Sequence, residues 1–248
     1  MKILIANWKM NPPTLAEAQE LFRAEIVEAA KYKNIKTVIC PPFVYIEELA
    51  KIDGTKLGAQ DVFWKESGPF TGEISTEMLK NFGVSHVLIG HSDRRYKIGE
   101  TDEMINKKTK AALEAKIVPI LLVGEKNRGD DRRQILEKQL SADLEGLDSD
   151  QVSKVLIAYE PVWAISTTPG AEPDTPENTL GAIKIIKEFL SANFQFPISN
   201  FQFLYGGSVN KKNIADFLSH PEISGAVIGG ASLRKDEFAE MLRIVSKI

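Results

Sequence analysis

"VLIAYEPVWAIS", at residues 155–166, begins as a continuous apolar run and ends that run on a carboxylate, Glu160, with Pro161 directly behind it. Continuous apolar runs, rather than alternating ones, are typical of parallel strands that are buried on both faces. A carboxylate at the end of such a strand is costly unless it is solvated, paired or used in chemistry. The stretch therefore predicts a buried parallel strand whose carboxyl end presents a candidate functional acid.

Similar runs recur along the chain, and segments with apolar residues at spacings of three and four lie between them. The strand-like runs are "KILIAN" (2–7), "KTVIC" (36–40), "KLGAQ" (56–60), "HVLIG" (86–90), "VPILLVG" (118–124), "FQFLYG" (201–206) and "GAVIGG" (225–230). The helical patterns cover 14–32, 101–116, 132–146, 176–194 and 236–248. Strand–helix alternation with right-handed crossovers predicts an α/β fold, and eight repeats in 248 residues predict a single (β/α)8 barrel domain over residues 1–248. A doubly wound open sheet is the alternative, but neither G-x-G-x-x-G nor G-x-x-x-x-G-K-[ST] occurs to support it.

Composition excludes several classes of protein. A net charge of −3 and a sequence pI of about 5.8 argue against nucleic acid or an anionic membrane as the main partner, because both need a basic face. No apolar run has the length of a transmembrane helix, and the N-terminus lacks the pattern of a secretory signal. The single cysteine, Cys40, fits a reducing compartment, so we expect a cytoplasmic protein. The spacing of His86, His91 and His220 matches no zinc motif, so no metal is expected.

Polar residues gather where the predicted strands end, and barrels form their active sites at that end. Asn7 and Lys9 follow the first strand, His91 the fourth and Glu160 the sixth, while "YGGS" (205–208) and "GGAS" (229–232) follow the last two. Glycine-rich loops can hold a phosphate on backbone N–H groups. Taken singly, the acid could be an ion-paired rim residue, the histidine structural, the lysine solvated and the glycines simple turns. Together at one barrel end they favour an active site.

These residues stand in motifs that resemble triosephosphate isomerases over essentially the whole chain. The motifs are "ANWKMN" (6–11), "CPPF" (40–43), "GAQ" with "FTGEIS" (58–75), "GHSDRR" (90–95), "GETDEMINKK" (99–108), "AYEPVWAI" (158–165), "LYGGSV" (204–209) and "GGASL" (229–233). The resemblance implies a TIM barrel that interconverts dihydroxyacetone phosphate and D-glyceraldehyde 3-phosphate through an enediolate. It implies no metal and no organic cofactor.

The resemblance also implies a role for individual residues. Glu160 would be the base, a neutral His91 would polarise the carbonyl, and Lys9 beside Asn7 would offset the negative charge. Ile165 would cover the base, and backbone N–H groups would bind the phosphate at Ser166, Ser208, Gly229 and Gly230. The loop around Phe70-Thr71-Gly72-Glu73 resembles the loop that inserts into a second subunit near the partner's Lys9. A homodimer is implied, with a tetramer as the alternative assembly.

The sequence departs from the family pattern in four places. Asp93 replaces a glutamate and is expected near Lys9 and Arg95, Val227 replaces a leucine, and Leu122 replaces a cysteine. The lid segment reads "STTPGAEPDT" (166–175), which is longer than usual and lacks the usual glycine and lysine. Because each proline fixes φ, its composition predicts a stiffer lid that still closes, hinged near 161–163 and 174–175.

Two other functions compete with the isomerase. A barrel aldolase would use Lys9 as a Schiff-base amine, but that needs an uncharged amine, whereas a neighbouring anion favours the ammonium. A diverged, non-catalytic barrel would bind phosphorylated metabolites or a protein partner without chemistry. The presence of Glu160, His91 and Lys9 together favours an enzyme, because binding alone does not require a base.

Overall fold

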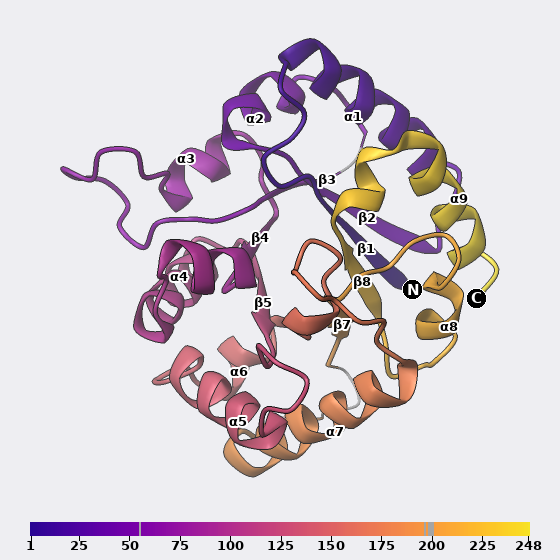
Figure 1. Cartoon of the computed structure of the whole chain (residues 1–248). Helices are drawn as coiled ribbons and strands as arrows, with labels where there is room; N and C mark the ends of the chain where they lie inside the picture. Colours follow the sequence, from indigo (N-terminus) through magenta and orange to yellow (C-terminus); the bar gives the residue numbers. More distant parts are fainter. Residues whose placement is uncertain (55, 196, 198–200) are drawn as a thin grey trace.

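Eight parallel strands close into a barrel in the order β1-β2-β3-β4-β5-β6-β7-β8 (Figure 1). The computed structural model describes residues 1–54, 56–195, 197 and 201–248. Pairing of β8 with β1 closes the sheet, with Ile5 opposite Val227. The predicted (β/α)8 barrel is therefore confirmed. The strands are β1 (Lys2–Asn7), β2 (Ile35–Cys40), β3 (Lys56–Ala59), β4 (His86–Ile89), β5 (Val118–Val123), β6 (Leu156–Tyr159), β7 (Phe203–Tyr205) and β8 (Gly225–Ile228).

Helices surround the barrel and alternate with the strands (Figure 1). The five predicted helices are confirmed with shorter ends, whereas four shorter helices, α2, α3, α6 and α8, were not predicted because each spans too few turns for a clear 3.6-residue period. The α-helices are α1 (Leu15–Ala29), α2 (Phe43–Ala50), α3 (Thr76–Asn81), α4 (Asp102–Glu114), α5 (Arg132–Asp143), α6 (Ser149–Val152), α7 (Pro176–Asn193), α8 (Ile214–Leu218) and α9 (Lys235–Val245). Short turns of other types are the π-helix η1 (Arg94–Ile98) and the 3-10 helices η2 (Val162–Ala164) and η4 (Gly230–Leu233).

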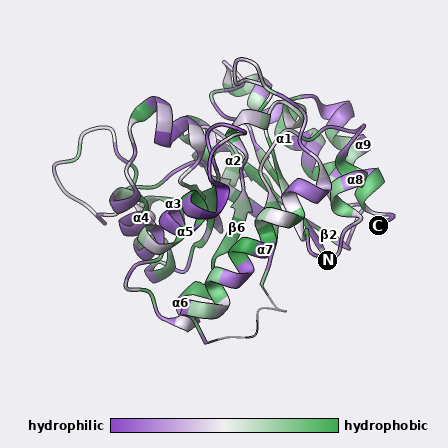
Figure 2. Ribbon diagram, turned by 60° about the horizontal axis from the view of Figure 1, so that its bottom comes forward, coloured by the Kyte–Doolittle hydropathy of each residue, from purple (hydrophilic) through white to green (hydrophobic). Residues whose placement is uncertain are grey.

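Apolar side chains cover both faces of the strands, inside the barrel and between the strands and the helices. Alternate strand residues point inward and form a cluster made of strand side chains, which includes Ile5, Leu88 and Leu122. The intervening residues, such as Leu4 and Ile89, pack against the helices in a larger outer cluster. Figure 2 shows hydrophobic colour on β6 inside the barrel, and hydrophobic and hydrophilic stretches that alternate along α7. Each fully buried aliphatic side chain contributes about 1.5–3 kcal/mol of transfer free energy, so this packing fixes the strand ends that carry the site.

Helix starts follow the expected capping chemistry. Thr14, Ser75, Thr101 and Thr175 each accept a hydrogen bond from the backbone N–H three residues later. Side-chain oxygens in this position satisfy one of the free N–H groups of a helix N-terminus. The cap at Thr175 fixes the point at which the lid segment becomes helix α7.

The segment between β3 and α3 leaves the barrel as a long projecting loop (Figure 1). It contains the sequence around Phe70-Thr71-Gly72-Glu73, and Phe70 packs on Phe63 with ring centroids 4.7 Å apart. Across the described part of the chain, no helix combines the length and apolar character needed to cross a membrane.

Candidate active site

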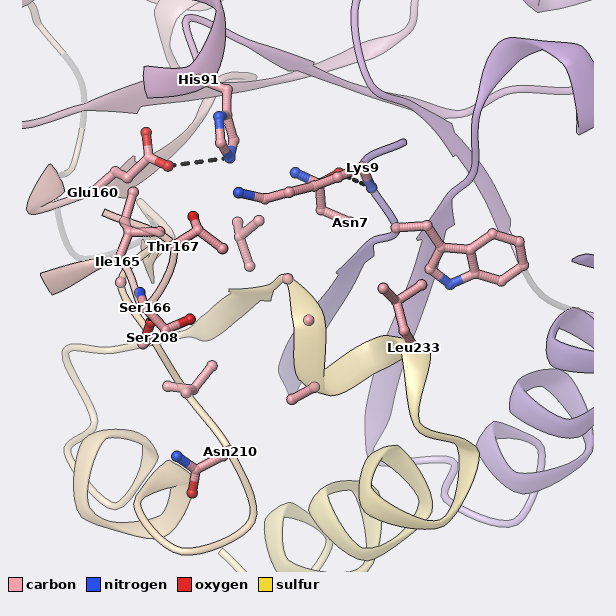
Figure 3. A pocket seen from close by; sticks show the side chains of 18 of the residues that line it. Asn7, Lys9, His91, Glu160, Ile165, Ser166, Thr167, Ser208, Asn210 and Leu233 are labelled. Carbon is pink, nitrogen blue, oxygen red and sulfur yellow. Dashed lines mark hydrogen bonds and ion pairs between the residues drawn. The ribbon is translucent and has the colours of Figure 1, made fainter. Parts of the chain in front are cut away.

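A pocket of about 410 Å³ opens at the carboxyl ends of the strands (Figure 3). Its wall is formed by residues from the loops after β1, β4, β6, β7 and β8. Every residue that the sequence placed in the site, apart from Asp93, lines it: Asn7, Lys9, His91, Glu160, Ile165, Ser166, Ser208, Val227, Gly229 and Gly230. Asp93 does not line the pocket but contacts Lys9, which does. The fold thus brings residues more than 200 positions apart into one cavity.

Glu160 follows β6 and is held from both sides. Its backbone N–H donates to the Val123 carbonyl at 2.8 Å, which continues the strand pairing by one residue. Gly124 lies so close to the Glu160 backbone that a Cβ there would come within 2.1 Å of the Glu160 carbonyl oxygen. The side chain is buried, and its Oε2 accepts the Ser92 N–H at 2.8 Å. Oε1 lies 3.2 Å from His91 Nε2 and has no other polar partner.

The hydrogen bond to His91 determines which of its nitrogens carries the proton. The backbone N–H of Asp93 donates to Nδ1 at 3.0 Å, so Nδ1 must present its lone pair. In the neutral ring the proton is therefore on Nε2, the atom that points toward Glu160 in Figure 3. The ring is almost completely buried. His91 is thus positioned to donate one hydrogen bond into the pocket.

Lys9 has an uncommon backbone conformation, with φ at 54°. A non-glycine residue in this region is strained and persists where surrounding contacts hold it. Here the Lys9 N–H donates to Asn7 Oδ1 at 3.0 Å, and the Lys9 carbonyl accepts Gln60 Nε2 at 2.7 Å. The Lys9 side chain extends into the pocket, toward the side on which Glu160 and Ile165 lie (Figure 3).

Asp93 contacts two ammonium groups. Its Oδ2 lies 2.9 Å from Lys9 Nζ, and its Oδ1 lies 2.7 Å from Lys97 Nζ. Burial raises the pKa of Asp93, but hydrogen bonds from Lys97 and Lys9 outweigh it and lower the pKa to about 2. The aspartate is therefore ionised at neutral pH, and the contact predicted with Lys9 is present.

Arg95, two residues after Asp93, was expected to share a charge network with it, but its guanidinium pairs with other carboxylates. Arg95 turns away from the pocket and pairs with Asp102 at 2.5 Å and Asp143 at 2.6 Å. It also donates to the Gly90 carbonyl at 2.7 Å, and a Cβ at Gly90 would come within 2.8 Å of its guanidinium. Burial raises the pKa of Asp143 to about 7, although Arg95 opposes that shift. Arg95 therefore secures the loop after β4 to α4 and α5.

The segments expected to bind phosphate meet on the other side of the pocket. The Ser166 N–H donates to Ser208 Oγ at 2.7 Å, which joins the start of the lid to the loop after β7. Gly229 and Gly230 lead into η4, whose Ser232 N–H folds back onto the Gly229 carbonyl at 2.8 Å. A Cβ at Gly230 would meet no atom within 4 Å, so this backbone faces open space.

The lid is attached to the barrel chiefly at its two ends. Before it, Trp163 donates through Nε1 to Glu125 Oε1 at 3.0 Å. At its far end, Asp174 accepts hydrogen bonds from Thr179 Oγ1 at 2.9 Å and from Asn178 Nδ2 at 2.6 Å. Between these points the side-chain attachments include a part-buried hydrogen bond from Thr168 Oγ1 to the Val162 carbonyl at 2.9 Å and an exposed ion pair between Arg128 and Glu172.

Sequence reasoning missed several residues that shape the site. Gln60 belongs to the "GAQ" motif (58–60), but no sequence pattern indicates that its amide donates to the Lys9 carbonyl. The Ser92 N–H that binds Glu160 is a backbone group and leaves no sequence signal. Lys97 could have been found, because it stands four residues after Asp93, a spacing that pairs charges on helical turns.

The arrangement suits proton transfer next to a carbonyl. A carboxylate oxygen of Glu160 and the Nε2–H of His91 face each other over 3.2 Å, and the ammonium of Lys9 lines the same pocket. Such a reaction needs a positioned base, and donors aimed at the developing oxyanion. Within residues 1–54, 56–195, 197 and 201–248, no group of three or more His, Cys, Asp or Glu side chains is placed to hold a metal ion.

Comparison with known sequences and structures identifies the family. The family model described as "Triosephosphate isomerase" matches residues 2–245. The triosephosphate isomerase of Dictyoglomus thermophilum is 45% identical over 250 residues, covering 98% of each chain. That of Alkaliphilus metalliredigens is 42% identical over 243 residues, covering 95% of this chain and 96% of its own. The crystal structure of triosephosphate isomerase from Bartonella henselae superposes with a TM-score of 0.85 at 32% identity, covering 98% of both chains. The chain belongs to the triosephosphate isomerase family.

Proposed function

We propose that Glu160, His91, Lys9 and Asn7 perform the reaction of this family, the interconversion of dihydroxyacetone phosphate and D-glyceraldehyde 3-phosphate. The observation that carries the proposal is the approach of Glu160 Oε1 to His91 Nε2 at 3.2 Å across one pocket. When substrate enters, the two side chains move slightly apart. The Glu160 carboxylate then faces the substrate C–H group, and the His91 Nε2–H faces the neighbouring carbonyl oxygen. Substrate therefore enters between these two side chains.

Glu160 moves the proton between the two carbons. Its Oε1 takes the proton from the carbon beside the carbonyl, the C–H electron pair forms the carbon–carbon double bond, and the carbonyl oxygen becomes an enediolate oxygen. Returning the proton to the neighbouring carbon, with proton exchange between the two oxygens, completes the isomerisation. Oε2 remains bonded to the Ser92 N–H and keeps the carboxylate oriented. A positioned base of this kind typically contributes about 10²–10⁴-fold to rate.

His91 and Lys9 stabilise the negative charge that forms on oxygen. The Nε2–H of His91 donates to the carbonyl oxygen and can pass a proton between the two oxygens. The Lys9 ammonium offsets the charge of the enediolate and of the phosphate, and Asn7 holds the Lys9 backbone. Donors that are fixed before the reaction stabilise a developing oxyanion without the cost of reorganising.

The phosphate is proposed to bind the backbone N–H groups of Ser166, Ser208, Gly229 and Gly230. Ile165 and Val227 are both buried and line the same pocket, so they supply the apolar cover over the reacting carbons. Excluding water protects the enediolate from eliminating phosphate. Closure of the lid performs this exclusion, a motion for which triosephosphate isomerases are a standard example.

We infer that the chain forms a homodimer through the loop around Phe70-Thr71-Gly72-Glu73. Phe70 is 40% exposed on this projecting loop, and Met10, directly after Lys9, is 93% exposed. Large apolar side chains at the surface favour a protein interface when they lie beside a projecting element. Inserting the loop near the partner's Lys9 would cover Met10. Phe70→Asp should give a monomer in sedimentation velocity with reduced activity, whereas an unchanged sedimentation coefficient would contradict this interface and a fourfold mass would indicate a tetramer.

We further infer that residues 1–248 form one domain that works in the cytoplasm. Pairing of β8 with β1 joins the two ends of the chain in one sheet, so neither half has a closed barrel of its own. Thermal unfolding should therefore show a single transition. Two separated transitions would contradict the single domain.

The competing functions receive less support than the isomerase. Lys9 Nζ lies 2.9 Å from Asp93 Oδ2, an ion pair that favours the ammonium over the free amine of a Schiff-base aldolase. The decisive experiment is a coupled isomerase assay on purified protein, with Lys9→Met measured beside it. We expect turnover in the unmodified protein and a large loss in the variant, with no borohydride trapping of substrate. Absence of turnover would contradict catalysis, and trapping on Lys9 would support the aldolase.

A further inference from the structure

The counter-ion of Lys9 is shared with a second lysine. Asp93 offers Oδ2 to Lys9 at 2.9 Å and Oδ1 to Lys97 at 2.7 Å. Asp93 also lies 3.6 Å from His91 Nδ1, through Oδ2. The nearby guanidinium of Arg95 is engaged by Asp102 and Asp143 instead. The charged neighbours that face Asp93 in the described chain are thus the two ammonium groups, with the imidazole beside them.

We propose that Lys97 is a positioning residue for Lys9 and acts on it through Asp93. This inference rests on the proposed role of Lys9 in binding the phosphate and the enediolate. Lys97 does not line the pocket, and it touches neither the base nor the segments expected to bind phosphate. Its effect on the reaction is therefore transmitted by the carboxylate that both lysines bind.

The local fold places Lys97 at the outer oxygen of Asp93. Residues 94–98 form the π-helix η1, which the Gly99 N–H closes by donating to the Arg94 carbonyl. Gly99 adopts φ of 80°, a left-handed conformation that suits glycine and ends the turn. A π-turn is rare and is often found at functional sites. Here it brings Lys97, four residues on, back over Asp93 from the solvent side.

The contact of Lys97 with Oδ1 of Asp93 also fixes the direction of Oδ2, the oxygen that contacts Lys9. An aspartate has a shorter side chain than the glutamate of the family pattern, so it reaches Lys9 with less freedom of approach. With Lys97 on Oδ1, rotation of the carboxylate is restricted and Oδ2 stays directed at Lys9. Without Lys97, Asp93 can turn both oxygens toward Lys9 and draw its ammonium away from the pocket.

The second lysine also changes the charge that substrate meets. Two ammonium groups and one carboxylate leave one positive charge, whereas Lys9 paired with Asp93 alone would leave none. A phosphate dianion in the pocket is therefore attracted by a lysine that is only partly neutralised. Lys97 is 67% exposed, so its pair with Asp93 contributes little to folding stability. The expected effect is on binding and turnover rather than on the fold.

Lys97→Met tests the proposal, with Lys97→Arg as the conservative variant and Lys184→Met as the control. Lys184 forms a pair of the same i,i+4 type with Glu188, at 4.0 Å on α7, away from the pocket. We expect Lys97→Met to raise KM and the inhibition constant for inorganic phosphate about three- to fivefold, which corresponds to an ion pair worth up to about 1 kcal/mol. Lys97→Arg should restore both constants, and Lys184→Met should change neither. A loss of correctly folded protein alone would lower kcat and leave the two constants unchanged, which would contradict the proposal.

Combining Lys97→Met with Asp93→Glu separates transmission through the carboxylate from a direct effect of charge. The longer glutamate can hold Lys9 without an outer anchor, so Lys97→Met should have a smaller effect on KM in the Asp93→Glu background. Non-additivity of this kind is the signature of contacting residues. Equal effects in the two backgrounds would overturn the proposed transmission.

Lys9→Met, measured in parallel, distinguishes failure of the proposed function from failure of the proposed role of Lys97. If Lys9→Met leaves KM, kcat and phosphate inhibition unchanged, the proposed role of Lys9 is wrong, and this inference fails with it. If Lys9→Met is severely impaired while Lys97→Met matches the unmodified enzyme, the proposed function stands and only the role of Lys97 is wrong.

Discussion

The carboxyl end of the barrel, called the mouth here and represented by Glu160 and His91, is held rigidly by buried contacts. The lid, residues 166–175, is largely exposed and loosely held. At the mouth, Glu160 and His91 are buried, and each receives a backbone N–H, from Ser92 at 2.8 Å and from Asp93 at 3.0 Å. In the lid, by contrast, Ser166 and Gly170 are exposed. Groups that carry out chemistry must keep their geometry within fractions of an ångström, whereas a segment that admits substrate must move.

The anchoring of the lid is strongest where its hinges are expected. Trp163 is tied to Glu125 on one side, and Asp174 to Thr179 on the other. Burial raises the pKa of Asp174, and hydrogen bonds, including one with Tyr205, oppose that shift. Fixed ends around a loose middle concentrate any motion at residues 161–163 and 174–175. The hinge positions remain predictions, and they differ from the mouth in a way that mutations can test.

The largest effect is expected from the base at the rigid mouth. Glu160→Gln keeps the size of the side chain and can still accept the Ser92 N–H, but its amide cannot take up a proton at neutral pH. We expect kcat to fall by about 10²–10⁴-fold while inorganic phosphate still binds. Steady-state kinetics and inhibition by phosphate measure the two quantities. Near-normal turnover, with contaminating isomerase excluded by mass spectrometry, would remove Glu160 from the mechanism.

A shortened lid should have the next largest effect and a different signature. Deleting residues 167–172 removes the exposed middle and leaves Trp163 and Asp174 in place. We expect turnover to fall by roughly a hundredfold, because the pocket is no longer closed over the phosphate. The yield of eliminated phosphate per turnover should rise, because water reaches the enediolate. If neither quantity changes, the lid does not perform the closure proposed for it.

Much of the mouth was predictable because strand ends have a fixed place in a barrel. Glu160, His91 and Lys9 each follow an apolar run, and the geometry of parallel strands brings such positions together. The glycine-rich turns before Ser208 and at Gly229 were predictable for the same reason. Fold and site were thus encoded by pattern and by position along each strand.

The partners of these residues were less predictable, because they depend on side-chain direction rather than on position. Arg95 was expected in a charge network with Asp93, but it donates to the Gly90 carbonyl and pairs with Asp102 and Asp143. Lys97, rather than Arg95, pairs with Asp93. A sequence pattern places these residues within a few positions of one another but does not resolve which neighbour each side chain faces.

A smaller effect is expected from the exposed contact that joins the lid to the loop after β5. Arg128 pairs with Glu172 of the lid and lies over the Trp163 ring, 5.3 Å from its centroid. Both charged side chains are largely exposed, so the pair contributes at most about 1 kcal/mol. Arg128→Ala should change kcat by no more than about fivefold and increase phosphate elimination in proportion.

The matched control for that pair is Arg133→Ala, because Arg133 is also exposed and pairs with Glu137 and Glu188 on α5 and α7 rather than with the lid. It should leave kcat and elimination unchanged. If Arg128→Ala behaves like this control, the ion pair does not contribute to holding the lid.

The smallest effect is expected where the mouth already departs from the family pattern. Asp93→Glu restores the longer side chain, and Lys9 and Lys97 both remain within reach of a carboxylate. We expect kcat/KM to stay equal or to rise by no more than about threefold, because the present pair is exposed enough to be worth under about 1 kcal/mol. Initial rates over a range of substrate concentrations measure this change. A large loss would show that the backbone of η1 (Arg94–Ile98) has adjusted to the shorter residue, so that the extra methylene now pushes the Lys9 ammonium out of the position from which it faces the pocket.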